Sequence, residues 1–185
     1  MRARITRGEN GLQLRQLRLR DYDGVAALWR GTPGIGLDDE CDSRRGIARY
    51  LRRNPGLSFV AIARGRVVGA VLCGHDGRRG YLHHLTVTPA WRGRGAGAAL
   101  VAACLTALGH HGIPKCNIFL FRANRRGRVF WRHVGWKLRK DLQVMQRVTR
   151  TPMAKRPPRG AAGDNPRPAA GVRAGVSGRR RPDSD

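Results

Sequence analysis

The stretch LTVTPAWRGRGAGAAL, residues 85–100, decides the fold. A strand-like run ends at Val87, Pro89 turns the chain, and a glycine-rich loop opens onto an apolar segment with helical periodicity over about 96–110. A loop of this kind presents unpaired backbone N–H groups at the positive end of a helix dipole, which favours binding of phosphate or pyrophosphate. Glycine lets ligand oxygens approach the backbone where a Cβ would intrude.

Two familiar phosphate-binding loops do not fit this segment. A P-loop requires Gly-Lys-Ser/Thr, which is absent here. A dinucleotide-binding fingerprint is formally met by Gly93, Gly95 and Ala98. That fingerprint should follow the first strand of a βαβ unit and precede an acidic residue by about 20 positions. Here it follows three strand-like runs, and the next acidic residue is Asp141, so this interpretation is excluded.

The elements around the loop predict a mixed α/β fold. Alternating or continuous apolar runs predict strands over 12–17, 57–63, 67–73, 81–87, 116–121 and 136–147. Helical spacing predicts helices over 22–30, from Ser43 to Asn54, over 96–110 and over 125–134. This order predicts one domain, residues 12–149, with a mixed, mostly antiparallel central sheet and helices on both faces.

The two ends of the chain differ from this domain in composition. Residues 1–11 are expected to form a flexible N-terminus. Residues 150–185 are rich in Gly, Pro and Arg and lack aromatic residues, Leu and Ile, so we expect a disordered basic tail. No apolar run reaches the length of a membrane helix, and because the first 20 residues contain no apolar core segment we expect no secretory signal. With four cysteines at no zinc-site spacing, we expect a cytoplasmic protein with reduced thiols and no metal.

The net charge of +25 is spread along the chain and comes mostly from arginine. One interpretation is attraction to polyanions, with weak association to nucleic acid or the ribosome. The other is a generic arginine-rich surface. No arginine run is interleaved with aromatic residues in a nucleic-acid motif, which favours the second interpretation.

The segment Arg92-x-x-Gly95-x-Gly97 resembles the acyl-CoA loop of the GNAT acetyltransferase family, whose pattern is Arg/Gln-x-x-Gly-x-Gly/Ala. Flanking segments resemble the family in the same order along the chain. LRLRDYDGVAALW at 17–29 is similar to its first strand and helix, and GRVVGAVL at 65–72 to a hairpin. The spacing of Asn124, Trp131 and Gly135 resembles the family's Asn-x(6)-Tyr-x(3)-Gly ending. Small single-domain bacterial members are the most similar.

This resemblance implies the acyl-CoA N-acyltransferase fold, with acetyl-CoA as the acetyl donor. In the family, backbone groups at the end of the strand before the loop bind the pantetheine arm, and loop amides bind the pyrophosphate. An Asn after the next strand helps to hold the arm, and arginine side chains in the loop add charge. The resulting cofactor-binding candidates are Leu85, Thr86, Val87, Arg92, Gly93, Arg94, Gly95, Ala96, Gly97, Ala98 and Asn124.

Transfer to an amine needs a base, because a free amine with a pKa near ~10 is mostly protonated at neutral pH. His83 is the first candidate, and the period-2 rule places it on the strand face of Leu85 and Val87. His84 would face the other way and is the weaker candidate. Either histidine could instead be a partly buried residue satisfied by the backbone.

Three positions depart from the family pattern or add to it. Trp131 stands where the family usually has the Tyr that protonates the leaving thiolate, and an indole N–H is not a useful acid. Phe119 stands where members that modify protein N-termini carry a Glu. Acidic residues 38–42 fall in a loop that edges the acceptor pocket in the family, and they would attract a cationic amine or simply be solvated.

The sequence therefore predicts a cytoplasmic N-acetyltransferase that transfers acetyl from acetyl-CoA directly to a primary amine in a ternary complex. The acceptor, a small molecule or a protein, is left open. The alternative is a catalytically weak or inactive module of the same fold that binds acetyl-CoA, a polyanion such as RNA or the ribosome, or both. No membrane association is expected.

Overall fold

The computed structural model describes residues 6–7, 11–147 and 149. The chain divides into two compact units, Met1–Arg139 and Lys140–Asp185. The described residues of the second unit, 140–147 and 149, contain no helix or strand. Residues 150–185, for which a disordered tail was expected, and most of the expected flexible N-terminus lie outside the described residues.

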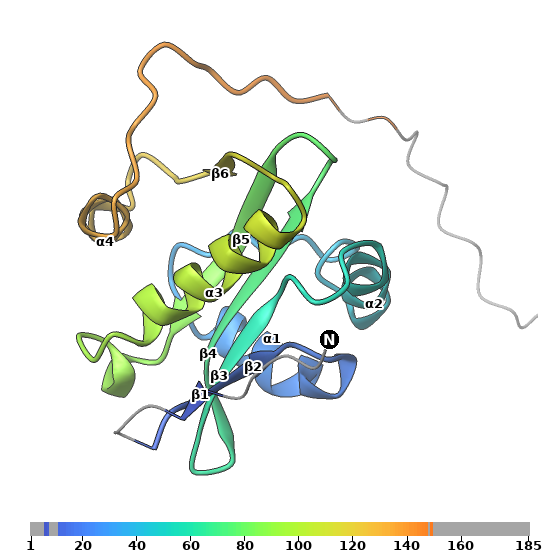
Figure 1. Ribbon diagram of the computed structural model, residues 1–185, viewed down its shortest axis with the longest axis vertical. Coiled ribbons are helices and arrows are strands. Elements are labelled where there is room, and N and C mark those ends of the chain that lie inside the picture. Colours follow the sequence, from blue (N-terminus) through green and yellow to red (C-terminus); the bar gives the residue numbers. More distant parts are fainter. Residues whose placement is uncertain (1–5, 8–10, 148, 150–185) are drawn as a thin grey trace, which may run out of the picture. The chain divides into compact units, whose positions relative to one another are not determined.

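The first unit is built on a six-stranded sheet whose spatial order follows the sequence (Figure 1). All neighbouring strands are antiparallel except the last pair, which is parallel. This is the mostly antiparallel mixed sheet that the sequence predicted. The strands are β1 (Thr6–Arg7), β2 (Gln13–Gln16), β3 (Phe59–Ala63), β4 (Arg66–His75), β5 (Gly80–Val87) and β6 (Cys116–Ile118).

Four α-helices and two 3₁₀ turns complete the unit, and all four helices were predicted. The Ser43 side chain accepts a hydrogen bond from the Gly46 amide and so caps the second helix, which was predicted to start at this residue. The elements are η1 (Leu19–Asp21), α1 (Tyr22–Arg30), α2 (Arg44–Arg53), η2 (Pro89–Trp91), α3 (Ala96–His110) and α4 (Arg125–His133).

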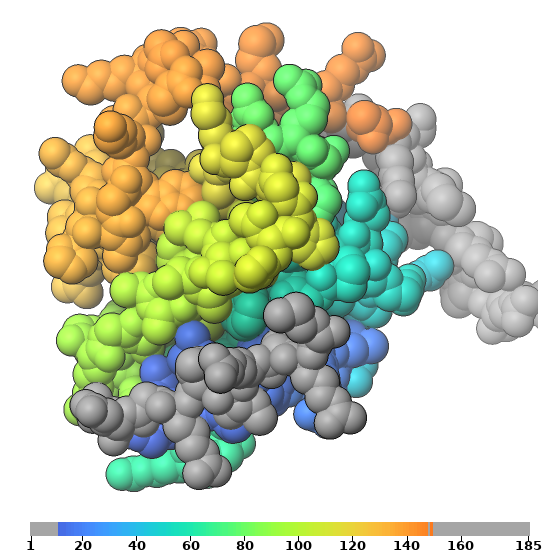
Figure 2. Space-filling model, viewed as in Figure 1, coloured from blue at the N-terminus to red at the C-terminus, as the bar shows by residue number. Residues whose placement is uncertain are grey.

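Two hydrophobic clusters hold helices against the two faces of the sheet. Leu100 and Cys104 of α3 share the first cluster with Val71 of β4. Trp29 of α1 shares the second cluster with Leu72, the next residue of β4. Successive residues of β4 thus face opposite layers, because side chains alternate across a strand. Figure 2 shows α3 and the chain that follows it, in yellow-green to yellow, covering one face.

Two strand predictions at the end of the unit are wrong. The strand predicted over 116–121 ends at Ile118, and the one predicted over 136–147 is absent. Leu138, Leu142 and Val144 are each at least 60% exposed, so their alternation finds no buried face. An alternating pattern forms a strand only where a partner edge and a covering layer exist. No helix in the described part of the chain is long and apolar enough to cross a membrane.

Candidate cofactor and acceptor site

The loop between β5 and α3 is fixed at its start by backbone and side-chain hydrogen bonds. The Thr88 amide donates to the Val68 carbonyl at 2.8 Å, which ties the end of β5 to β4. The Trp91 amide donates to the Thr88 carbonyl at 2.9 Å and closes the turn η2. The Arg92 Nε donates to the Val87 carbonyl at 2.9 Å, so this side chain braces the loop against the strand.

The three loop glycines have different structural roles. Gly93 and Gly95 have φ of +71° and +79°, in the left-handed region that favours glycine, and a Cβ on either would meet no atom within 4 Å. Gly97 is helical, and a Cβ there would lie 3.1 Å from the Phe130 ring of α4. Gly93 and Gly95 therefore shape an open loop, whereas Gly97 permits close packing between α3 and α4.

The loop presents a run of unpaired amides. The first amide of this helix end to find a backbone acceptor is that of Ala99, which donates to the Gly95 carbonyl at 2.9 Å. Within the described part of the chain, no hydrogen-bond acceptor is found for the amides of residues 93–98. These N–H groups lie at the N-terminus of a 15-residue helix, which is the arrangement that favours anion binding.

Beside this loop the sheet splits. Strands β5 and β6 pair only from Gly80 opposite Cys116 to Leu82 opposite Ile118. β5 continues to Val87, and no described strand pairs with its last five residues on that side. A free strand edge can hydrogen bond to an extended ligand that carries amide groups of its own. The unpaired edge of β5, which includes Leu85, Thr86 and Val87, is connected through the turn η2 to the unpaired amides of the loop.

A β-bulge in β5 corrects the predicted orientation of the two histidines. Ala70 of β4 pairs with Thr86, but Leu72 pairs with His83, so β5 carries one extra residue over this interval. His84 absorbs it with φ of +52°, a left-handed conformation that is uncommon for a non-glycine residue. Leu85 packs against the α3 cluster. The extra residue breaks the period-2 rule, so the prediction that His83 shares a face with Leu85 was wrong.

His83 lies among aromatic rings on the other side of the sheet, toward α2. Its ring is 6.2 Å from Tyr50, edge-on, and 6.4 Å from Tyr81, stacked. No hydrogen bond to its imidazole is found among the described residues. Burial, and then the neighbouring charge of His84, lower the pKa of His83, while Asp42 opposes this shift. The lowered pKa favours the neutral imidazole, and neither ring nitrogen has a hydrogen-bond partner among the residues that the structure describes.

His84 lies on the same side of the sheet as His83. It is bound to residues 38–42, called the acidic loop here. Its Nε2 is 2.8 Å from an oxygen of Asp42, and both side chains are mostly buried. The second Asp42 oxygen accepts from the Asp38 amide at 2.8 Å, and the His84 carbonyl accepts from the Trp29 indole at 3.0 Å. These bonds tie the loop, helix α1 and the bulge together. The pairing of His84 with Asp42 was not predicted from the sequence.

Two carboxylates of the acidic loop form hydrogen bonds within the protein. The Asp38 carboxylate accepts hydrogen bonds from the amides of Glu40 and Cys41, and these bonds lower its pKa. Asp42 is engaged by His84. The acidic segment is thus a folded turn docked on the sheet, with only part of its charge directed outward.

Tyr50 is a second residue of this site that sequence reasoning missed. Its hydroxyl is buried and has no hydrogen-bond partner within the described part of the chain. Burial raises the pKa of Tyr50, so the phenol is un-ionised at neutral pH. Tyr50 lies within the helix predicted from Ser43 to Asn54, and no local motif distinguishes it there. Tyr81, by contrast, donates its hydroxyl to Asp76 at 3.3 Å in the β4–β5 turn.

Asn124 precedes α4 as its N-cap, and Trp131 lies within this helix. Asn124 caps the helix, since its Oδ1 accepts from the Gly127 amide at 2.8 Å. Trp131 is buried in the α3 cluster with its ring 4.9 Å from that of Trp136. Phe119 is 62% exposed and stacks on Tyr81. Trp131 therefore anchors α4 to the core, and the Asn124 cap leaves its amide nitrogen without a protein partner in the described structure.

An α/β sheet that splits beside a glycine-rich, amide-lined helix N-terminus defines the class of acyl-CoA-dependent acyltransferases. Residues 15–136 match the acetyltransferase (GNAT) family, and the chain belongs to this family. It is 38% identical over 106 residues to an acetyltransferase of Photorhabdus laumondii, covering 56% of this chain and 71% of that protein. It is 34% identical over 116 residues to an acetyltransferase of Sodalis glossinidius, covering 59% and 75%.

Solved structures share the fold at low sequence identity. The PaiA N-acetyltransferase of Thermoplasma acidophilum, in complex with coenzyme A, matches with a TM-score of 0.62 and 19% identity over 69% of this chain and 91% of that one. The enzyme AAC(6′)-Iy, in complex with a bisubstrate analogue, matches with a TM-score of 0.57 and 21% identity over 76% and 99%. In the described ranges, no group of three His, Cys, Asp or Glu side chains is placed to hold a metal ion.

Proposed function

We propose that this protein is an N-acetyltransferase that transfers the acetyl group of acetyl-CoA to a primary amine. One observation carries the proposal: the unpaired edge of β5 is followed, after the turn η2, by the unpaired amides of residues 93–98. An extended pantetheine arm has amides that suit such an edge, and a pyrophosphate suits the helix N-terminus. The two surfaces follow each other in the order in which these groups occur in CoA.

The cofactor contacts follow from this placement. Backbone groups of residues 85–87 bind the pantetheine arm, and loop amides from Gly93 to Ala98 bind the pyrophosphate. Arg92 holds the loop in place through Val87, and the exposed Arg94 adds positive charge beside the phosphates. The free amide nitrogen of Asn124 donates to the arm from α4, while its oxygen keeps the helix capped. Strand amides near the bulge polarise the thioester carbonyl.

His83 is the proposed general base. An amine nitrogen attacks the carbonyl carbon of the thioester, the carbon–sulfur bond breaks, and CoA leaves as a thiolate. The proton lost by the amine goes to the neutral imidazole of His83, directly or through one water. The burial that lowers the pKa of His83 keeps it in the form that can accept this proton. His84 is engaged with Asp42 and is not the proposed base.

Protonation of the leaving thiolate does not require an acidic side chain at Trp131. A thiol pKa near ~8.5 makes thiolate a tolerable leaving group, and water can supply the proton. The role proposed for Trp131 is to fix α4 through its packing in the α3 cluster. Tyr81 is not a substitute acid, because its hydroxyl donates to Asp76 in the turn.

The acceptor side lies where the acidic loop and the aromatic side chains of α2 and β5 meet. The carboxylates that remain exposed there favour a cationic amine over an anionic one. One structural neighbour is described with an aminoglycoside analogue, which is a polyamine, but this likeness extends to the fold alone. We therefore propose a primary amine as the acceptor class. All four cysteines are free thiols, which supports a reducing compartment such as the cytoplasm.

The alternative is a module that binds acetyl-CoA or a polyanion without turnover. The observations in its favour are the charge of +25 and the missing tyrosine at position 131. None of the relatives and structures reported above is described with nucleic acid. Affinity for RNA that falls steeply with salt would support this alternative.

The deciding experiment is calorimetric titration of acetyl-CoA into the full-length protein, followed by thiol release with a panel of primary amines. We expect micromolar binding, and release that depends on one class of amine. The variant His83→Gln should bind acetyl-CoA as the wild type does and release CoA at least about 100-fold more slowly. Tight binding without release on any amine would support the inactive module, and absence of binding would overturn the proposal.

A further inference from the structure

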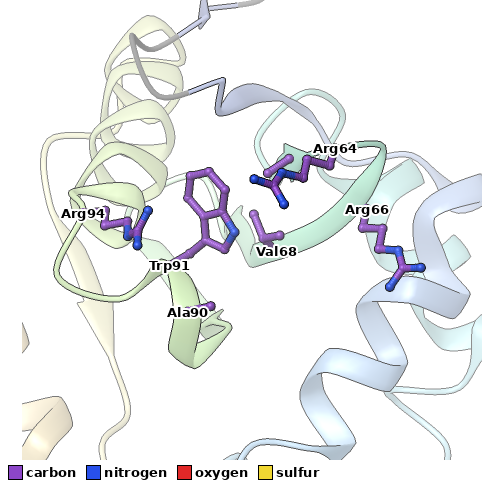
Figure 3. A pocket seen from close by; sticks show the side chains of 7 residues that line it. Arg64, Arg66, Val68, Ala90, Trp91 and Arg94 are labelled. Atoms are coloured by element: carbon purple, nitrogen blue, oxygen red, sulfur yellow. The ribbon is translucent and has the colours of Figure 1, made fainter.

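Two described residues other than glycine have a positive φ, and they lie in different settings. Arg64, with φ of +48°, forms with Gly65 the two-residue turn of the β3–β4 hairpin, at the edge of the pocket drawn in Figure 3. The tight turns of such hairpins favour left-handed residues. His84, with φ of +52°, lies inside strand β5 and not in a turn. A residue in this conformation persists only where the surrounding structure holds it there.

Contacts from the acidic loop, from α1 and from β5 itself hold His84 in place. Its Nε2 lies 2.8 Å from Asp42, and both side chains are mostly buried. A carboxylate only accepts hydrogen bonds, so the Nε2–H of His84 is the donor. The His84 carbonyl accepts from the Trp29 indole at 3.0 Å and from the Thr86 hydroxyl at 3.2 Å. The Trp29 ring also packs edge-on against the imidazole, with centroids 5.0 Å apart.

Asp42 is fixed by bonds of its own, so it can act as an anchor. Its carbonyl accepts a hydrogen bond from the Tyr22 hydroxyl of α1 at 3.0 Å. Its amide donates to the Asp38 carbonyl at 2.9 Å, and its second carboxylate oxygen accepts from the Asp38 amide at 2.8 Å. The carboxylate therefore reaches His84 from a position that the loop and α1 determine together.

The conformation of His84 decides on which face of the sheet His83 lies. With residue 84 extended, the period-2 rule would place His83 on the face of Leu85, against the α3 cluster. With residue 84 left-handed, His83 lies on the opposite face, beside Tyr50 and Tyr81. A bulge can re-aim a neighbouring side chain in this way. The contact that fixes His84 therefore also fixes the orientation of His83.

We propose that Asp42 and His84 are positioning residues: Asp42 holds the bulge through His84 and so keeps the imidazole of His83 directed toward the acceptor side. This inference rests on the proposed function in naming His83 as the general base. The orientation of the His83 ring can nevertheless be measured without turnover. Neither positioning residue is required to touch the amine or the thioester.

Two variants of His84 separate the bond to Asp42 from the preference of the backbone. His84→Gln keeps an N–H donor on a long side chain but is a poor residue for a positive φ. His84→Asn is favoured at a positive φ but is too short to replace Nε2. We expect kcat within about threefold of the wild type for His84→Gln and at least about tenfold lower for His84→Asn, with KM for acetyl-CoA within twofold in both.

NMR measures the position of the His83 ring in the full-length protein. In the wild type we expect NOEs between the ring protons of His83 and Tyr50, which lie edge-on. These NOEs should be lost in Asp42→Ala and in His84→Asn. The matched control is Asp21→Ala, which removes a carboxylate of similar burial from a 2.7 Å pair with Arg15. It should keep the NOEs, and kcat should stay within twofold.

Three results would overturn the inference. The first is NOEs and kcat that survive in both Asp42→Ala and His84→Asn, which would limit the pair to docking the loop. The second is a higher kcat in His84→Asn than in His84→Gln, which would assign the bulge to backbone preference alone. The third is an equal loss in Asp42→Ala and Asp21→Ala, which would indicate a general effect of stability.

Failure of the proposed function would look different from these results. If the wild type transfers acetyl to no amine, the kcat comparison falls away together with the role of His83 as a base. NOEs that are lost in Asp42→Ala and kept in Asp21→Ala would still establish that Asp42 sets the orientation of His83.

Discussion

Gly95 allows the cofactor site to be tested separately from the stability of the fold. It precedes α3 with φ of +79°, and a Cβ there would meet no protein atom within 4 Å. Gly112 follows the same helix with φ of +70° and equally open surroundings. Substituting alanine at either position therefore imposes the same backbone cost, at opposite ends of one helix. Only Gly95 lies among the amides of residues 93–98.

The expected magnitude follows from these backbone angles. A left-handed L-residue costs about 1–2 kcal/mol, and stiffening the unfolded chain returns about 0.4–1 kcal/mol. With no steric clash to add, Gly95→Ala and Gly112→Ala should each lower the free energy of unfolding by about 1 kcal/mol. For a domain of this size the melting temperature should fall by roughly 3–5 °C. Both variants should therefore remain folded at 25 °C.

Acetyl-CoA binding should distinguish the two variants. The methyl group of Gly95→Ala enters the space through which phosphate oxygens reach the loop amides, so we expect affinity to fall at least about tenfold, or 1.4 kcal/mol. Gly112→Ala should bind as the wild type does. Thermal melts and calorimetric titration of acetyl-CoA measure both quantities on the same samples. Equal affinity in the two variants would refute the placement of the pyrophosphate on this loop.

Three further predictions concern the acceptor side and α4. Because burial lowers the pKa of His83, its NMR titration should give a value below 6.5, and stability should fall as pH drops through that range; His83→Gln should flatten this part of the pH profile. Asp42→Ala should lower the free energy of unfolding by about 1–3 kcal/mol, because it leaves the mostly buried His84 without its partner. Urea unfolding measures this change, and a loss below about 0.5 kcal/mol would contradict the role of the pair in docking the loop. Asn124→Asp should keep the α4 cap and melting temperature but weaken acetyl-CoA binding, whereas Asn124→Ala should lose about 1 kcal/mol of stability as well; unchanged binding in Asn124→Asp would exclude the amide from the site.

Local sequence signals correctly predicted the helices and the open glycine-containing turn before α3. The spacing of apolar residues defines α3, and its predicted bounds match Ala96–His110. The start of α2 was predicted at Ser43, whose hydroxyl accepts a hydrogen bond from the amide three residues ahead. The glycines at 93 and 95 predicted an open turn before a helix N-terminus. Each of these features depends on residues that are close neighbours in the chain, so a short window of sequence contains the whole signal.

The geometry around His83 and His84 was decided by tertiary structure. The bulge at His84 is set by the register between β4 and β5, and one extra residue reversed the predicted orientation of His83. The pairing of His84 with Asp42 joins residues 42 positions apart. The split between β5 and β6 depends on where β6 ends, and residues 136–147 form no strand although they alternate. Register and strand pairing depend on which distant segments meet in the folded chain, so they are not specified by any local pattern.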